Sequence, residues 1–244
     1  MVYILLPIYN EESSLSILLE KLDKGMKRKG FQYHIVAYND GSKDKSLDIL
    51  NKYKESMPVT VIGEEKNKGL GVALRSLLEE ALKLSVDKED IVVVLDSDDT
   101  HNPEHIHHMM NKLRDGFDVA IASRYLPDSR MVGVTGLRQL FSIGASWLMR
   151  ALFPIKGVKD YTCGYRAYTI DCLRKAYEKF GERLIEEQSF ACMAELLIKL
   201  RSLNIIAVEI PIILRYDQKR GESKMKVFQT IHRTLLMLYR LKQV

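Results

Sequence analysis

The 244 residues are 46% hydrophobic and 28% charged, a composition typical of globular chains that excludes intrinsically disordered and fibrous proteins. Lysine and arginine total 37 against 32 acidic residues, for a net charge of +5. This mild excess suits phosphates or anionic lipid and gives no reason to expect a nucleic-acid partner. Because no linker-like stretch divides the chain, we predict a single domain over residues 1–244.

Cysteine content and hydropathy indicate the cellular compartment of the protein and its relation to membranes. Cys163, Cys172 and Cys192 are an odd number without the spacing of metal ligands, so we expect a reducing compartment and no disulfide framework or zinc knuckle. The strand-like run at residues 2–6 does not resemble a signal peptide. No run of about eighteen apolar residues could cross a bilayer. We therefore expect a cytoplasmic protein, peripheral at the cytoplasmic face of a membrane.

The first half alternates short β-branched runs with amphipathic segments, which predicts parallel strands joined by crossover helices. The expected strands are Val2–Leu6, Tyr33–Ala37, Val59–Ile62, Ile91–Leu95 and Val119–Ala122. The expected helices between them are about Glu12–Lys29, Lys45–Lys54, Gly69–Leu84 and Pro103–Arg114. Ligands gather at the carboxyl ends of such strands, so the polar residues after each strand are the candidates for a site.

The second half is less regular. It predicts a helix at Leu140–Phe153, a strand at Tyr165–Ile170, a helix at Gln188–Leu203 and an extended run at Ile205–Leu214. A basic amphipathic helix is expected at about residues 226–242, where Val227, Ile231, Leu235 and Leu238 recur at helical spacing. It could lie on an anionic membrane surface, or equally pack on its own domain or on a membrane-protein partner.

An acidic cluster follows the most apolar expected strand. Asp96 and Asp98 are two apart, so in extended backbone both carboxylates point to the same side. Mg²⁺ or Mn²⁺ commonly uses one or two carboxylates together with substrate phosphates. Such a metal would neutralise a departing nucleoside diphosphate. The alternative is a polar loop in which Asp99 or Thr100 caps the next helix, but the polar strand ends expected around the cluster favour a metal site.

Short motifs occur in order over most of the chain. They are Pro7-Ile8-Tyr9-Asn10-Glu11, Asp40-Gly41-Ser42 with Asp44, Gly69-Leu70-Gly71 with Ala73, Leu95-Asp96-Ser97-Asp98 with Pro103, Ser123-Arg124-Tyr125, Arg138 with Ser142, Cys163-Gly164-Tyr165-Arg166 and Gly221-Glu222-Ser223-Lys224. The ordered set resembles the inverting family 2 glycosyltransferases, and among them the dolichyl- or polyprenyl-phosphate mannosyl- and glucosyltransferases. The resemblance implies a glycosyltransferase-A type α/β fold, with a mostly parallel central sheet and flanking helices.

The resemblance also implies a donor site. Pro7, Tyr9 and Glu11 would lie around the nucleotide, and Asp40 would contact the base. Asp96 and Asp98 would hold the metal, with Thr100 as a further ligand, and Asp96 would also contact the nucleotide sugar. Lys68 could reach a phosphate, although an exposed lysine at a helix start is commoner. Two residues depart from the family pattern: Asn39 stands where an acidic residue is usual, and Asp99 where a hydrophobic residue is common.

The acceptor side is expected to hold phosphate. A lipid phosphate is already anionic near neutral pH and needs to be held in line, whereas a hydroxyl acceptor would need a general base. By resemblance Arg124, Arg138, Ser142 and Lys224 match acceptor-phosphate positions, and the displacement would invert the anomeric carbon. Asp98 and Arg124 are thus the expected catalytic residues. Lys219 and Arg220 are further phosphate candidates by charge alone, and a solvated surface charge is the alternative for each.

Other polar residues have simpler interpretations. Asp160 could pair with Arg166 as a structural salt bridge. Glu187 could act as a base toward a hydroxyl acceptor, although a glutamate at a helix start is the simpler account. Histidines at positions 101, 105, 107 and 108 lack the full ligand set of a zinc site.

The sequence therefore predicts a metal-dependent inverting transfer of a hexose, from a donor of the GDP-mannose or UDP-glucose type, to a polyprenyl or dolichyl phosphate. Three alternatives remain. One is transfer to a saccharide or protein hydroxyl, and a second is a sugar nucleotidyltransferase, which would release pyrophosphate. The third is a degenerate scaffold, against which the intact Asp96 and Asp98 argue.

Overall fold

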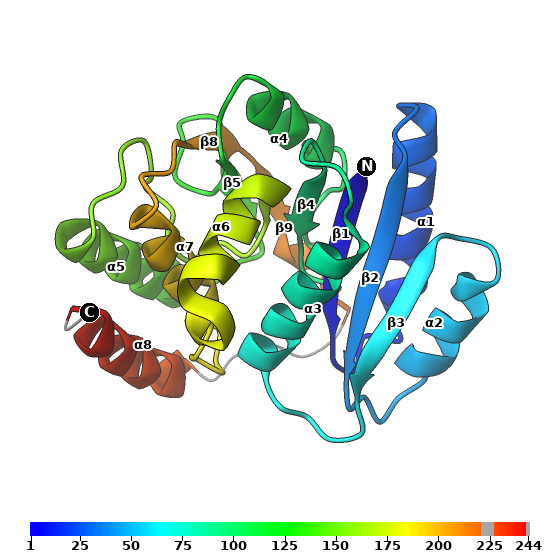
Figure 1. Ribbon diagram of the computed structural model, residues 1–244. Helices are drawn as coiled ribbons and strands as arrows, with labels where there is room; N and C mark the ends of the chain where they lie inside the picture. The colour runs from blue at the N-terminus through cyan, green and yellow to red at the C-terminus, as the bar shows by residue number, and fades with distance from the viewer. Residues whose placement is uncertain (221–226, 243–244) are drawn as a thin grey trace.

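The computed structural model describes residues 1–220 and 227–242, without the side chains of residues 137, 138, 227 and 228. Its centre is a seven-stranded sheet in the order β3-β2-β1-β4-β7-β5-β8 (Figure 1). Its strands are β1 (Val2–Ile8), β2 (Tyr33–Asp40), β3 (Val59–Glu64), β4 (Ile91–Val94), β5 (Val119–Ser123), β7 (Arg166–Thr169) and β8 (Ala207–Pro211). Two short strands, β6 (Arg130–Val132) and β9 (Ile213–Arg215), form a separate parallel pair.

Helices flank the sheet, with α3 and α6 in front of it and α1 behind it in Figure 1. The α-helices are α1 (Leu15–Arg28), α2 (Ser46–Lys54), α3 (Leu70–Leu84), α4 (His105–Arg114), α5 (Gly136–Leu152), α6 (Ile170–Phe180), α7 (Cys192–Arg201) and α8 (Val227–Lys242). Short 3-10 turns lie at Gly181–Leu184 and Tyr216–Gln218. The predicted fold class, α/β with a mostly parallel sheet, is confirmed.

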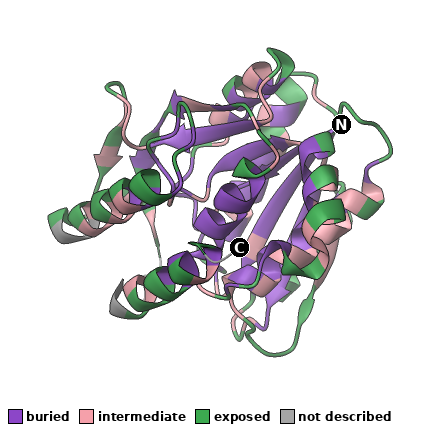
Figure 2. Cartoon of the chain, turned by 60° about the vertical axis from the view of Figure 1, so that its left-hand side comes forward, coloured by how far each residue is buried: buried purple, intermediate pink, exposed green. Residues whose placement is uncertain are grey.

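The hydrophobic pattern explains why the sheet forms. Strand β1 has an almost unbroken run of buried side chains, because helices cover both faces of its sheet. Figure 2 shows this buried centre between more exposed helices. On α1 the buried residues recur at the spacing of one helix face: Leu15, Leu18, Leu19 and Leu22. Burying each leucine contributes about 1.5–3 kcal/mol.

Strand β7 departs from a parallel sheet. It runs antiparallel between β4 and β5, with Arg166 paired to Val94 on one side and to Ile121 on the other. Because of this direction, the loop that precedes β7 lies at the carboxyl ends of β4 and β5. The antiparallel insertion therefore brings the segment 160–165 to the edge of the sheet where ligands are expected.

Helix α6 and strand β6 were not predicted from the sequence, and the extended run predicted at Ile205–Leu214 did not separate β8 from β9. Helix α6 begins directly after β7, where the Thr169 hydroxyl accepts the N–H of Cys172 as an N-cap. Threonine followed by Asp171 is a start signal that sequence reasoning could have used. Strands β6 and β9 have three residues each, too few for a periodic pattern to be recognised.

The predicted terminal helix is present, beginning at residue 227 within the described chain. It lies beside α5 (Figures 1 and 2). Its inner face is buried through Met237, Leu238 and Leu241, so it packs on its own domain. Within residues 1–220 and 227–242, the helices are too short or too polar to cross a membrane.

The three cysteines are free and buried. Burial raises the pKa of Cys163 and of Cys172 to about 12. They therefore behave as small core residues.

Candidate active site

The site begins where the strand order reverses. Strand β1 lies between β2 and β4, and in open α/β sheets ligands bind beyond the carboxyl ends of the strands at such a point. The residues that follow β1 and β4 meet there, since the Ser97 hydroxyl donates to the Pro7 carbonyl at 2.9 Å. The Ser14 hydroxyl joins the same two loops by bonding to the Glu11 carboxylate at 3.2 Å and to the Ser97 carbonyl at 3.3 Å.

Asp98 is the more buried carboxylate of the acidic pair. One oxygen accepts the Thr100 hydroxyl at 2.7 Å and the Thr100 N–H at 3.2 Å, and the other accepts the ammonium of Lys219. Burial alone would raise the pKa of Asp98, but the Lys219 charge and these hydrogen bonds outweigh it and lower that pKa. Asp98 is therefore held as a carboxylate.

Asp96 faces water from a recessed position. Its side chain is 44% exposed, yet burial is the largest cause that raises its pKa, and the nearby Asp98 charge adds to this. The Asp96 N–H donates to Nδ1 of His101 at 3.3 Å, which places the proton of a neutral His101 on Nε2. A Cβ at Gly164 would come within 3.6 Å of Asp96 Oδ1, so the loop before β7 passes beside this carboxylate.

The donor atoms here fit a divalent cation. Asp96 has exposed oxygens, and Asp98 already attracts the positive charge of Lys219. Among the described residues, no group of three or more His, Cys, Asp or Glu side chains is placed to hold a metal. A site of two carboxylates completed by substrate phosphates is typical of Mg²⁺ or Mn²⁺ rather than Ca²⁺. Metal binding by Asp96, Asp98 and Thr100 stays a prediction.

Asp99 does not belong to this pair. It has a positive φ of 62°, and both its oxygens accept from Lys21 of α1, at 2.8 and 2.7 Å. Helix α4 begins at His105, so neither Asp99 nor Thr100 caps it as the alternative interpretation proposed.

The expected nucleotide site includes Asp40, which is buried at the end of β2. Its two oxygens accept the backbone N–H groups of Lys68 and Gly69 at 2.7 and 3.0 Å. Asp40 therefore fixes the turn into α3, and its predicted contact with the base stays a prediction. The Lys68 side chain is exposed, and Asn39 accepts the Ser42 N–H at 3.3 Å within the neighbouring turn.

Glycines at the start of α3 allow close approach of a second loop. Gly69 has a φ of 94°, and a Cβ there would lie 2.7 Å from the Gln188 carbonyl oxygen. A Cβ at Gly71 would lie 1.8 Å from the Glu187 carbonyl oxygen. The Gly71 N–H donates to the Gln188 carbonyl at 3.1 Å. The glycines thus have a structural role beside the expected nucleotide site.

Replacing Gly71 by alanine is expected to lower the free energy of unfolding by about 1–3 kcal/mol, because the added methyl overlaps backbone that cannot rotate away. Gly144 in α5 is the matched control, since a Cβ there meets nothing within 4 Å. Gly144→Ala should raise the free energy of unfolding by about 0.5–1 kcal/mol, because alanine favours a helix interior more than glycine does. Urea denaturation of both variants tests this, and equal stabilities would contradict the close packing.

Arg124 is fixed beside the acidic pair by a buried carboxylate. Its Nε and Nη2 donate to the two oxygens of Asp160 at 2.7 and 2.6 Å, and the Asp160 side chain is fully buried. Burial would raise the pKa of Asp160, but Arg124 outweighs it and keeps that pKa below the ordinary value. The Arg124 charge acts against the burial that raises the pKa of Asp96, but its effect is smaller.

Three hydroxyls extend this arrangement. Arg124 Nη2 donates to the Thr162 hydroxyl at 2.6 Å, the Thr162 and Ser142 hydroxyls are 3.0 Å apart, and Tyr125 donates to Ser142 at 2.8 Å. The structure therefore brings together Arg124 and Ser142, which are 18 positions apart in the sequence. We call Arg124, Tyr125, Ser142, Asp160 and Thr162 the arginine cluster.

The other acceptor candidates are less defined. Arg220 is exposed and follows Lys219 directly. The side chain of Arg138 lies outside the described residues, as does all of Lys224 and its motif at residues 221–224. The involvement of all three in acceptor binding stays a prediction.

Two interpretations from the sequence change. Asp160 pairs with Arg124 rather than with Arg166, which donates instead to the carbonyls of Tyr161 and Met193, at 2.7 and 2.5 Å. Glu187 is buried, and its Oε1 accepts the Ser189 N–H at 2.9 Å. Because the Glu187 carboxylate binds the backbone of its own loop, the structure favours a structural role for it over that of a general base.

Sequence reasoning missed Thr162, gave Asp160 the wrong partner and ranked Lys219 too low. Thr162 and Asp160 belong to the arginine cluster, but a lone threonine gives no signal in sequence. Lys219 was a candidate by charge alone, yet it is the side chain that binds Asp98 across 121 positions of sequence. Only the fold reveals a pair so far apart.

The fold is of the glycosyltransferase-A type, and the acidic pair lies at its strand ends. The sequence matches glycosyl transferase family 2 over residues 3–179. The chain therefore belongs to this family, which confirms the family and the enzyme class that the motifs predicted.

Relatives and a solved structure show the same likeness. The chain is 32% identical over 241 residues to a dolichol-phosphate mannosyltransferase of Pyrococcus furiosus, covering 98% of this chain but 63% of that relative, under two thirds of its length. It is 26% identical over 224 residues to polyprenol monophosphomannose synthase of Mycolicibacterium smegmatis, covering 91% and 80%. Glucosyl-3-phosphoglycerate synthase of Mycobacterium tuberculosis, in complex with Mg²⁺ and uridine diphosphate, matches with a TM-score of 0.72 at 16% identity, covering 100% and 80%. This last likeness shows the fold alone.

Proposed function

We propose that this enzyme transfers a hexose, with mannose as the first candidate, from a nucleotide sugar to a polyprenyl or dolichyl phosphate. The observation that carries the proposal is the arginine cluster beside the acidic pair, because it presents a fixed cation and hydroxyl donors to an anionic acceptor. Two relatives named for lipid-phosphate mannosyl transfer support the acceptor class. The donor is of the GDP-mannose or UDP-glucose type.

Each part of the site has a task in this reaction. Asp96 and Asp98 would hold Mg²⁺ or Mn²⁺, which supplies charge neutralisation for the departing diphosphate. Asp160 engages Nε and Nη2 of Arg124, so Nη1 is the guanidinium nitrogen that would contact the acceptor phosphate. Ser142 and Thr162 can donate to the same phosphate. Because the acceptor oxygen is already anionic, in-line displacement needs positioning rather than a general base.

A comparison of acceptors tests this assignment. The purified enzyme should transfer sugar to polyprenyl phosphate and not to polyprenol, which has the same chain but ends in a neutral hydroxyl. Transfer to polyprenol or to a free saccharide at a comparable rate would instead support the hydroxyl-acceptor enzyme.

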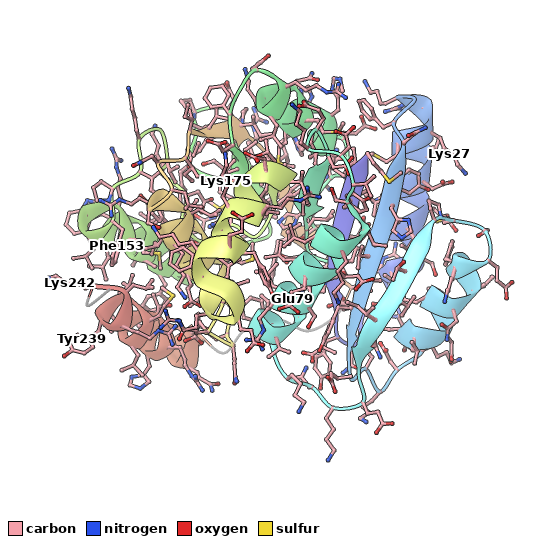
Figure 3. All side chains as sticks on the ribbon, in the orientation of Figure 1. Lys27, Glu79, Phe153, Lys175, Tyr239 and Lys242 are labelled. Carbon is pink, nitrogen blue, oxygen red and sulfur yellow. The ribbon has the colours of Figure 1, made fainter. Side chains whose placement is uncertain are left out.

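We also propose that α5 and α8 rest on the cytoplasmic face of a membrane. Their outer faces carry exposed apolar side chains, which we call the apolar face: Leu140, Ile143, Trp147, Leu235, Leu236 and Tyr239. Figure 2 shows exposed residues along both helices, and in Figure 3 Tyr239 and Lys242 point outward from α8. Trp147 is 70% exposed and Tyr239 69%, as suits interfacial aromatic residues. Arg150 of α5 and Lys242 of α8 are exposed, and their charge suits the anionic cytoplasmic leaflet.

Replacing Trp147 and Leu235 together by serine is expected to weaken binding to anionic vesicles by about tenfold or more, since each buried apolar side chain contributes about 1.5–3 kcal/mol. Co-sedimentation with phosphatidylserine vesicles measures this. Val86→Ser is the control, because Val86 is 92% exposed on the loop between α3 and β4, apart from the apolar face. Equal binding of all three proteins would contradict the membrane proposal.

A further inference from the structure

Helix α8 is held to the rest of the enzyme by two arginines. Arg240 Nη2 donates to Glu195 Oε1 at 2.7 Å, and Arg233 Nη1 lies 4.0 Å from Glu187 Oε1. Residues seven apart fall on the same side of a helix, two turns from each other. The two ion pairs therefore bracket the buried inner face of α8, which includes Thr234, Met237 and Leu238.

Glu195 joins α8 to the loop that precedes α7. Its side chain is fully buried, and its Oε2 accepts the backbone N–H groups of Glu186 and Glu187 at 2.9 and 2.7 Å. Its Oε1 accepts from Arg240 and also lies 3.0 Å from the ammonium of Lys199. A buried carboxylate is costly unless its oxygens are bonded, so these contacts are needed to keep Glu195 buried. The loop 186–188 and helix α8 are thus both held by this one side chain.

The same loop lies against the start of α3. The Gly71 N–H donates to the Gln188 carbonyl, and Gly71 has no room for a Cβ beside the Glu187 carbonyl. On its other side, the turn into α3 is bound by Asp40 through two N–H groups. A continuous series of direct contacts thus runs from α8 through Glu195 and the loop 186–188 to the nucleotide side of the site.

We propose that α8 is a positioning element for the nucleotide subsite, and that it acts through Arg240 and Glu195. The inference rests on the proposed function, since it takes Asp40 and the start of α3 to form the nucleotide subsite. Loss of the Arg240 contact releases one anchor of the loop 186–188, so the turn at residues 68–71 becomes less ordered and nucleotide affinity falls. Because the outer side of α8 belongs to the apolar face, this helix connects the membrane-facing surface with the donor subsite.

Arg240→Met tests the proposal while Lys199 remains on Glu195, so that the buried carboxylate keeps a cationic partner. Lys242→Met is the matched control, because it removes the same charge from an exposed position on the same helix. Arg240→Lys keeps the positive charge, so it should retain part of the nucleotide affinity that Arg240→Met loses. Titration calorimetry with GDP and UDP in the presence of Mn²⁺ measures affinity, and hydrogen exchange of the ligand-free protein measures order at residues 69–71 and 186–188.

The dissociation constant of the preferred nucleotide is expected to rise on the order of 3- to 10-fold in Arg240→Met, the range of a coupling between connected sites. The Gly71 amide should exchange faster, and Lys242→Met should match the wild type in both measurements. Unchanged affinity, or unchanged exchange at residues 69–71, would overturn the proposal even if the melting temperature fell. If the wild type bound neither nucleotide, the proposed function would fail. The exchange data would still show whether Arg240 controls the order of residues 69–71.

Discussion

Asp98→Asn is expected to lower metal-dependent transfer by about 10³-fold or more. Metal stabilisation of transition-state charge is worth several kcal/mol, and each 1.36 kcal/mol is a factor of ten in rate. Asparagine keeps the shape of the side chain but lacks the negative charge that attracts the metal and Lys219. Transfer assays with Mn²⁺ and calorimetric titration of Mn²⁺ together test whether activity and metal affinity fall in parallel.

Asp99→Asn is the matched control for this substitution. It makes the same chemical change one position along the chain, at a carboxylate that is bound to Lys21. Asparagine also tolerates the positive φ at this position. Asp99→Asn should therefore keep its metal affinity. If Asp98→Asn retained a substantial part of the wild-type activity, or if both variants lost metal affinity equally, the metal assignment would be wrong.

Arg124→Ala is expected to lower the free energy of unfolding by about 3–5 kcal/mol at pH 7, because it leaves the buried Asp160 carboxylate without its cationic partner. It should also remove transfer, since the arginine cluster loses its charge. Urea denaturation gives the stability. Lys175→Ala is the control: its pair with Asp171 is exposed, so no measurable change is expected.

The effect of Arg124→Ala should depend on pH. In the wild type the folded-state pKa of Asp160 is lowered, so the stability from this carboxylate is present at pH 5 and above, and is lost only as pH falls below about 4, the unfolded pKa. In the variant, burial without Arg124 should raise this pKa above its unfolded value. The folded variant then takes up a proton as pH falls, and the stability difference from the wild type should shrink between pH 7 and pH 5.

A second variant separates this explanation from general damage. Arg124→Ala combined with Asp160→Asn removes both charges, so it should be more stable at pH 7 than Arg124→Ala alone and should lose the extra pH dependence. A double variant as unstable as the single one would show that the ion pair is not the cause.

The sequence predicted the parts of the fold that depend on local pattern. The strands of the first half appear within a few residues of their predicted bounds, because buried strands between helices require unbroken apolar runs. The position of Asp96 and Asp98 was predictable for the same reason, since they directly follow such a strand.

The remaining features depend on contacts between distant segments. The antiparallel direction of β7 brings Asp160 and Thr162 to Arg124, and a strand of four residues is too short for its sequence to show this direction. The pairing of Lys219 with Asp98 and of Arg240 with Glu195 spans 121 and 45 positions. Glu195 lies on a helix whose residues are buried almost throughout, so no amphipathic pattern marked it.

The central claim is that this enzyme moves a sugar from a nucleotide to a lipid phosphate. Its most direct test is incubation of the purified protein with Mn²⁺, polyprenyl phosphate and a panel of radiolabelled GDP- and UDP-sugars, followed by counting of the organic phase. We expect label in the lipid from one donor, with GDP-mannose as the first candidate, and no transfer without polyprenyl phosphate. Label that appeared only in water-soluble glycan, or release of pyrophosphate in place of a nucleoside diphosphate, would contradict the account.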